Sequence, residues 1–562
     1  MKRKIFVSAM MAGSMMLSVS CTDKTTVMEN KLSDFIQKHE QLIKPLNRDG
    51  AIAYWDASIS GKDEDYARAE KLNLESAKVY SNTADFQFLK EIKESRLVQD
   101  EMLKRQLEVL YHAYLSKQVN VDKLEAIIKL ETEVEKKYAS FRAEIDGEKL
   151  SDNEIEDLLR ESDQSEVVKT TWMASKEIGP IVAEDVRNLV RLRNAVAVEL
   201  GFVNYHDMSL RLADQNPAEL DQLFDELDDL TRDAFAGLKD EIDVFLAKRF
   251  NITQEELMPW HYQNRYFQEA PKIYNVDLDQ YYKEQNLEKL TAEFFDGIGL
   301  NIDDMLAASD LYEKEGKYQH AYCMDVDREG DVRIVCNIKP NNSWMNTMLH
   351  EYGHGVYDKF NDRELPYTLR EPAHIFTTEA IAMLFGRFAS NGQWMQDMGI
   401  INAKEKEKIS EESFNSLRLE QLVFSRWAQV MYRFEKAMYA DPEQDLNKLW
   451  WDIVEKYQMI SRPEGRDMPD WATKIHVATV PCYYHNYLLG ELFASQLYYY
   501  ITANVVKSND FRNQSFVGNP ETGKYLTENV FKPGSRWYWN TMIEKATGEK
   551  LTARYYALQF VK

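Results

Sequence analysis

Apolar residues recur at intervals of three and four through most of the chain, and charged residues fill the positions between them. The stretch FQFLKEIKESRLVQDEMLKRQLEVLYHAYL, residues 86–115, is typical. This period predicts amphipathic helices from about Ser33 to Arg142. Further helices are expected after Ser151 and Asp163, which suit N-cap positions, with a stop at Gly201.

One short segment departs from the helical period. HAYCMDV (320–326) and VRIVCNI (332–338) are β-rich runs on either side of a turn that contains Gly330. They predict a β-hairpin. Cys323 and Cys336 flank the turn, and the sequence leaves open whether they form a disulfide or remain two buried thiols.

Glycine and proline are sparse, at 22 and 14 residues, and no Ser/Gly/Pro-rich linker divides the chain. The apolar fraction of 44% in 562 residues suffices for a sizeable core. The formal charge of −24 argues against a nucleic-acid partner, whose phosphates need clustered Lys and Arg. Four cysteines are too few for a disulfide framework in a chain of this length.

The amino terminus has the pattern of an export signal. Basic residues 2–4 precede a short apolar stretch, which predicts a signal peptide over residues 1–20. Cys21 follows LSVS, which resembles a loose bacterial lipoprotein box; an ordinary signal peptide beside a cysteine is the alternative. We therefore expect a lipid on Cys21 as the only membrane contact, residues 21–29 as a tether, and, from Thr22, location in the outer membrane. No later apolar run is long enough to cross a bilayer.

The segment SWMNTMLHEYGHGVYDKF, residues 343–360, carries the strongest chemical signal. Its apolar spacing predicts a helix capped at Ser343, which places His350 and His354 on one face, one turn apart. Two imidazoles at this spacing can bind one Zn²⁺, and Glu351 is placed to act as general base on a water. The alternative is a helix whose two histidines are merely solvent-facing or part of the core.

A catalytic zinc needs a third protein ligand. A second helix, TTEAIAMLFGRF, is expected to begin at a cap on Thr377 or Thr378, which brings Glu379 into its first turn and back over the histidine pair. Glu371 and His374, in the loop between the helices, are rival ligands.

The stretch HEYGHGVYDKFNDRELPYTLREPAHIFTTEAIAMLFGR resembles the peptidyl-dipeptidase A family of zinc peptidases, which includes angiotensin-converting enzyme. The likeness runs from about residue 150 to the end of the chain. It implies one Zn²⁺ bound by His350, His354 and Glu379, with Glu351 as the catalytic base.

The segment KIHVATVPCYYHNYLLGELFASQ extends the resemblance. By this likeness Lys474 and Tyr484 hold the C-terminal carboxylate of the substrate, and His476 and Tyr487 assist the scissile carbonyl. His320, in the hairpin, falls where the family has a histidine that bonds the substrate backbone.

The chain departs from the family pattern at several positions. The tyrosine assignments need a one-residue shift, without which Tyr483 takes the first role and Asn486 displaces the second tyrosine. His485-Asn486 stands where the animal enzymes have a chloride-binding arginine, which puts chloride activation in doubt. Met383 replaces an acidic partner of a zinc histidine, so another group must orient that imidazole.

These observations lead to an all-α fold: one large helical body with a deep central cleft and a small β-hairpin beside the zinc helix. The metallopeptidase domain is expected over residues 30–562, with 30–145 as lid-like helices and 146–562 as the catalytic body. The resemblance implies oligopeptide substrates and release of dipeptides from a free C-terminus. A related helical oligoendopeptidase or carboxypeptidase is one alternative, and a non-catalytic surface lipoprotein that binds peptides or glycans is another.

Overall fold

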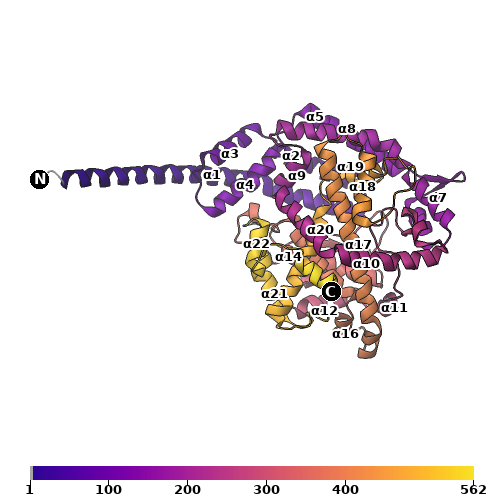
Figure 1. Cartoon of the computed structure of the whole chain (residues 1–562). Coiled ribbons are helices and arrows are strands. Elements are labelled where there is room, and N and C mark those ends of the chain that lie inside the picture. Colours follow the sequence, from indigo (N-terminus) through magenta and orange to yellow (C-terminus); the bar gives the residue numbers. More distant parts are fainter. Residues whose placement is uncertain (1–3, 562) are drawn as a thin grey trace.

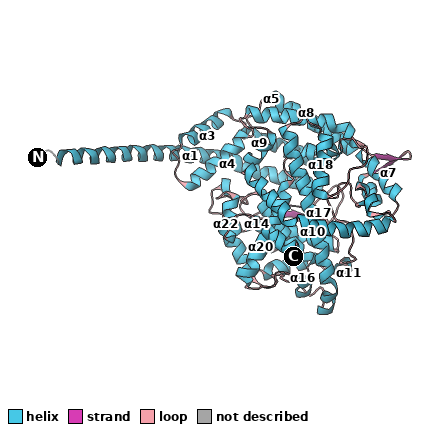
Figure 2. Cartoon of the chain, in the orientation of Figure 1, coloured by secondary structure: helices cyan, strands magenta, loops and turns pink. Residues whose placement is uncertain are grey.

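The computed structural model describes the backbone of residues 4–561 and the side chains of residues 24–561. Within that part the regular secondary structure is helical apart from two small antiparallel hairpins, which confirms the all-α prediction (Figures 1 and 2). The side chains of residues 1–20 and of Cys21 lie outside the described set, so the signal peptide and the lipid remain predictions. None of the described helices combines the length and the apolar character needed to cross a membrane.

The amino-terminal helices have a hydrophobic cluster of their own, to which Leu32, Leu89, Leu107 and Tyr114 contribute. Arg105 links these helices to the rest of the molecule, since its guanidinium donates to the Ser535 carbonyl at 2.9 Å and to Asp214 at 2.6 Å. The helices of this region are α1 (Lys4–Ser60), α2 (Asp63–Tyr80), α3 (Thr83–Ser95) and α4 (Glu101–Leu115).

A much larger core holds the remainder together, and it begins with Ile127 and Val134 of α5. By its packing α5 therefore lies with the main body, although the expected subdivision grouped it with the amino-terminal helices. The helices up to the predicted zinc helix are α5 (Val121–Ser140), α6 (Asp152–Glu161), α7 (Ser165–Lys176), α8 (Ile178–Glu199), α9 (Tyr205–Leu212), α10 (Pro217–Phe250), α11 (Asp279–Tyr282), α12 (Leu287–Gly297) and α13 (Asp303–Ala308).

The predicted zinc helix and the helix after it lie in the middle of this core. The remaining helices are α14 (Asn342–Lys359), α15 (Ile375–Gly386), α16 (Gly392–Asp397), α17 (Ala403–Ala440), α18 (Leu446–Gln458), α19 (Ile475–Thr479), α20 (His485–Tyr500), α21 (Pro520–Leu526), α22 (Trp539–Thr547) and α23 (Arg554–Phe560). α20 is buried along most of its length, which explains why its sequence is apolar all round rather than on one face.

Two antiparallel hairpins interrupt the helices. The predicted one is formed by β3 (Tyr322–Asp325) and β4 (Val332–Val335), with Cys323 opposite Ile334. Cys323 and Cys336 are therefore out of register with each other, and both are free thiols. The second hairpin, β1 (Ala143–Ile145) with β2 (Glu148–Leu150), was not predicted, because three-residue strands are too short to show an alternating pattern.

Three predicted helix caps are wrong. α14 is capped by Asn341, whose side chain accepts from Trp344 N, rather than by Ser343. α15 is capped by His374, which accepts from Phe376 N at 3.2 Å, rather than by Thr377 or Thr378. α7 begins after Gln164 rather than after Asp163. An asparagine or a ring nitrogen satisfies the free N–H groups as well as a hydroxyl does, and the sequence does not rank them. Ser151 does cap α6, in a capping box with Glu154.

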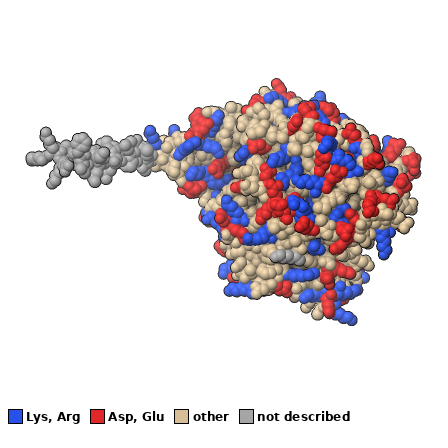
Figure 3. Space-filling view, in the orientation of Figure 1, with Lys and Arg blue, Asp and Glu red and all other residues tan. Residues whose placement is uncertain are grey.

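Acidic and basic side chains are interspersed over the visible face of the molecule (Figure 3). The excess of negative charge is thus spread over the surface in view rather than gathered in one field.

Candidate metal centre

Two glycines allow three helices to meet at the predicted metal ligands. A Cβ atom at Gly353 of α14 would lie 2.8 Å from the Ala382 backbone of α15, so only glycine permits this approach. A Cβ atom at Gly490 of α20 would lie 3.2 Å from the Cβ atom of Glu379. α15 is therefore held closely between α14 and α20, with Glu379 facing the histidine pair.

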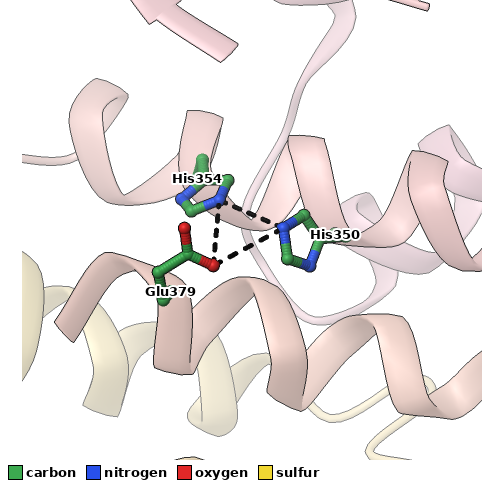
Figure 4. Close-up of side chains that lie close together, drawn as sticks. All are labelled: His350, His354 and Glu379. Carbon is green, nitrogen blue, oxygen red and sulfur yellow. Dashed lines mark hydrogen bonds and ion pairs between the residues drawn. The ribbon is translucent and has the colours of Figure 1, made fainter. Parts of the chain in front are cut away.

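His350, His354 and Glu379 converge on one point (Figure 4). The two Nε2 atoms are 3.3 Å apart, and Glu379 Oε2 lies 3.8 Å from His350 Nε2 and 3.9 Å from His354 Nε2. In the plane of these three atoms, the equidistant point is about 2.1 Å from each, which is the usual length of a zinc–nitrogen or zinc–oxygen bond. Glu379 is in the second turn of α15 rather than the first, because the helix begins at Ile375.

The protonation states of the three groups also suit a cation. Burial lowers the pKa of His350 to about 4 and that of His354 well below its usual value, so both imidazoles are neutral, as metal ligation requires. Burial raises the pKa of Glu379 to about 7. A divalent ion among these groups would oppose the cost of burying the carboxylate. The residues present therefore fit a zinc ion.

Thr378 orients one of the two imidazoles. Its Oγ1 atom lies 2.7 Å from Nδ1 of His354. With Nδ1–H donated to this hydroxyl, Nε2 directs its lone pair at the metal position. Thr378 thus supplies the second contact that Met383 cannot, since the Met383 sulfur lies against Gly490.

Glu351 is buried beside the triad, 7% exposed, and its carboxylate accepts a hydrogen bond from the backbone N–H of Cys323 in β3. Burial, followed by the nearby charge of Glu379, raises its pKa to about 8. A cation at the triad would lower this pKa again and leave a carboxylate able to accept a proton. The hairpin thus fixes the orientation of the predicted general base.

A cavity of about 680 Å³ opens onto these groups. Its lining combines the stripe His350, Glu351, His354 and Asp358 of α14 with residues of β3 and of the loop before α15. This volume lies within the usual range for ligand sites, and the cavity is the part of the predicted cleft next to the metal ligands.

The structure brings neither rival ligand to the triad. Glu371 is ion-paired with Arg328. His374 caps α15 with Nδ1, and its Nε2 atom lies 2.8 Å from the Ala213 carbonyl, so both ring nitrogens are occupied.

Lys474 lies in a mainly aromatic pocket. Its Nζ atom donates to Gln268 Oε1 at 2.6 Å and lies 5.0 Å from the Tyr266 ring, 5.6 Å from the Trp427 ring and 5.7 Å from the Tyr484 ring. Burial lowers the pKa of Lys474 to about 8. A buried ammonium without a carboxylate bonded to it is suited to binding an anion.

Aromatic rings connect this pocket to the triad. The Tyr484 ring is 5.3 Å from the His476 ring and 5.4 Å from the Tyr487 ring. Tyr487 and Tyr483 lie near enough to Glu379 for its charge to contribute to their raised pKa values. Tyr484 therefore faces Lys474, whereas Tyr483 and Tyr487 face the metal ligands.

His476 has a buried Nδ1 atom that makes no hydrogen bond with any residue in the described part of the chain, so this atom is available to a ligand. His320, by contrast, is exposed at the start of the hairpin, where its ring is 5.6 Å from that of Tyr318. Its predicted contact with the substrate stays a prediction.

His485 and Asn486, which replace the chloride-binding arginine, bond to opposite ends of one amide. Gln215 lies 2.7 Å from each of them, through Oε1 to His485 Nε2 and through Nε2 to Asn486 Oδ1. Burial lowers the pKa of His485 well below its usual value, so this network is neutral. The Asn486 side chain is therefore bonded to Gln215, which does not suit the role of the second tyrosine that the unshifted alignment would assign to it.

Sequence reasoning missed Gln268 and Thr378 as members of the site, and it named Tyr483 only as the alternative to Tyr484. Gln268 lies in an irregular segment some 200 residues before Lys474, and no local pattern marks it. The sequence predicts Thr378 as a helix cap, but its position next to a predicted ligand is a usable signal of a role in the site.

Comparison with known families gives one result that covers nearly the whole chain. A family model described as angiotensin-converting enzyme matches residues 26–560. A comparison with curated proteins gives no match.

Proposed function

The chain belongs to the angiotensin-converting enzyme family of metallopeptidases, and from this premise we propose that it is a zinc-dependent enzyme that releases dipeptides from the free C-terminus of oligopeptides. The observation that carries the proposal is the position of Lys474, a buried cation in an aromatic pocket that His476, Tyr484 and Tyr487 connect to the metal ligands. A cation at a set distance from the bond to be cleaved selects how many residues leave.

His350, His354 and Glu379 would hold the zinc ion, which when bound supplies Lewis acidity at the substrate carbonyl. Glu351 would take a proton from the attacking water and give it to the departing amine as the carbon–nitrogen bond breaks. Its bond to the Cys323 N–H keeps the carboxylate directed at the cavity. His476 and Tyr487 would donate hydrogen bonds to the oxygen that gains negative charge.

Gln268 has a specific part in this proposal. Its side-chain oxygen accepts from Lys474, and its amide nitrogen gives one N–H to Glu269 at 3.4 Å, which leaves the second N–H to bind the same carboxylate. Lys474, Gln268 and Tyr484 together would form three donors around the C-terminal carboxylate of the substrate.

The test is mass spectrometry of a decapeptide incubated with the enzyme, as the free acid and as the C-terminal amide, with and without a zinc chelator. The expected result is successive loss of dipeptides from the free acid, slow cleavage of the amide, and no cleavage with chelator. Internal cleavage at equal rates for both peptides would instead identify an oligoendopeptidase, and single-residue release a carboxypeptidase. Peptide binding without turnover in the zinc-loaded protein would favour the non-catalytic lipoprotein.

We further propose that the protein is exported and anchored in the outer membrane through a lipid on Cys21. The support is the order of basic residues 2–4, the apolar stretch and the cysteine. Labelling with a radioactive fatty acid would mark the parent and not Cys21→Ala. Label on both proteins, or on neither, would contradict the anchor.

A further inference from the structure

The cavity beside the metal ligands is lined by different groups at the end away from His350. Along α14 the lining runs from His350 through His354 to Asp358, which lies one further turn along the same face. Asp325, the last residue of β3, lines the same region. The cavity thus has imidazoles and a catalytic carboxylate at one end and two aspartates at the other.

The charges around this end are unevenly compensated. Arg328 is ion-paired with Glu371, and Arg370 with Glu329. Both of these arginines therefore form their ion pairs with other carboxylates, although the charge of Arg328 also lowers the pKa of Asp325 and of Asp358.

The third arginine nearby, Arg363, gives its N–H groups to the backbone carbonyls of Arg328, Asp358 and Lys359. Its charge contributes to the field at both aspartates, but it makes no ion pair with either.

Asp358 and Asp325 are left with spare acceptor capacity. No hydrogen bond or ion pair to another described residue involves the Asp358 carboxylate, which is enclosed by protein and faces the cavity. Among the residues that the structure describes, Asp325 accepts a hydrogen bond only from the backbone N–H of Arg328, through Oδ1 at 2.8 Å. Burial raises the pKa of both groups, and for Asp358 the Asp325 and Glu371 charges raise it further. The charges of Arg363 and Arg328 lower both pKa values, but neither aspartate is in an ion pair with a described residue.

The position of the pair relative to the metal ligands indicates which part of a substrate reaches it. None of the residues that line this cavity comes from the segment 474–487, in which the carboxylate pocket lies. A peptide whose C-terminus is at Lys474 would therefore extend its amino-terminal part into the cavity. One helical turn spans about 5.4 Å and an extended peptide advances about 3.3 Å per residue, so Asp358 is within reach of a side chain one or two residues before the cleaved bond.

From this geometry we infer that Asp358 and Asp325 form a subsite for a Lys or Arg side chain of the substrate, one or two residues on the amino-terminal side of the cleaved bond. This inference rests on the proposed peptidase function and names the class of peptide that the site prefers. A lysine ammonium or an arginine guanidinium group would supply the ion-pair partner that the two aspartates do not have among the described residues.

The experiment uses peptides that differ only by Lys or norleucine at each of the two positions before the cleaved bond. Norleucine keeps the length of the side chain and removes the charge. At one of these positions we expect kcat/KM to be at least about tenfold higher for the Lys peptide than for the norleucine peptide. This ratio corresponds to the free energy of one charge-assisted hydrogen bond in a partly buried site. The double variant Asp325→Asn/Asp358→Asn should bring this ratio close to one, and Asp358→Lys should favour a Glu peptide instead.

Glu364→Gln is the matched control, since it removes a carboxylate from the exposed loop after α14 without touching the cavity. It should keep the preference of the parent. A parent ratio near one, or a ratio that survives the double substitution, would overturn the subsite while leaving the peptidase proposal intact. If no peptide is cleaved, the peptidase proposal fails, and fluorescence anisotropy of the same labelled peptides on the zinc-loaded parent decides the subsite by their relative affinity.

Discussion

The metal triad and the Lys474 pocket are built in opposite ways. The triad takes its three ligands from two helices that pack through Gly353, and they lie within 30 positions of one another in the sequence. The Lys474 pocket takes its groups from a short helix start, an irregular segment and a long helix, with Gln268 and Lys474 more than 200 positions apart.

The difference teaches which property of the enzyme each region controls. Regular helices place the triad and Glu351 with little freedom, as metal chemistry requires. Irregular segments place the Lys474 pocket, where a change of loop alters which substrate is accepted without disturbing the metal. Substitutions at the triad should therefore change turnover and metal affinity. Substitutions in the Lys474 pocket should change recognition of the substrate C-terminus.

The largest effect is expected for Glu351→Gln. The amide keeps the shape of the side chain and an oxygen for the Cys323 N–H, but it cannot accept a proton. We expect kcat to fall by about 10²–10⁴-fold with the zinc content unchanged. Metal analysis and steady-state kinetics on the same preparation check this, and a variant that keeps its turnover would exclude Glu351 as the base.

Next in size is Lys474→Met, which removes the ammonium and keeps most of the side-chain volume. We expect kcat/KM for a free-acid peptide to fall by about 100-fold, because the substrate carboxylate loses a charged partner in a buried site. The C-terminal amide of the same peptide serves as the control and should change little. Equal losses for acid and amide would show that the pocket does not recognise the carboxylate.

Thr378→Val tests whether a residue that is not itself a metal ligand holds one of the ligands in place. Valine has nearly the same shape as threonine but cannot bond to His354 Nδ1. The zinc affinity, measured by competition with a chelator, should weaken by about 10- to 100-fold. Thr378→Ser should retain most of the parent affinity, and an unchanged affinity in the valine variant would remove Thr378 from the site.

The smallest effect is a pH dependence that belongs to the Lys474 pocket. Burial lowers the pKa of Lys474 to about 8, so the ammonium is present below this pH and is lost as the pH rises through it. KM for free-acid peptides should therefore rise by up to about tenfold per pH unit above pH 8. Lys474→Arg keeps its charge in this range. A profile that rises equally in this variant would assign the titration to another group.

The histidine pair of the triad could be predicted from the sequence, because an i, i+4 pair on a helix has one geometry whatever surrounds it. The hairpin was also predictable, from its alternating apolar positions and its glycine turn. The caps at Asn341 and His374 were not, since several side chains compete for the same N–H groups and tertiary contacts choose among them. The choice of Glu379 over Glu371 and His374 depended on the pairing of Glu371 with Arg328 and on the bond from His374 to Ala213.

By itself the sequence determined the helical body, the histidine pair with its neighbouring glutamate, and the membership of the family, because these depend on local periodicity and on motifs of short range. Only the tertiary structure decided that Thr378 orients His354, that Gln268 bonds to Lys474, that Tyr484 and Tyr487 face different groups, and that Asp325 and Asp358 share one end of the cavity. Each of these contacts depends on how segments pack and on which side of a loop or helix a side chain emerges, and such long-range packing leaves no periodic trace in the order of residues.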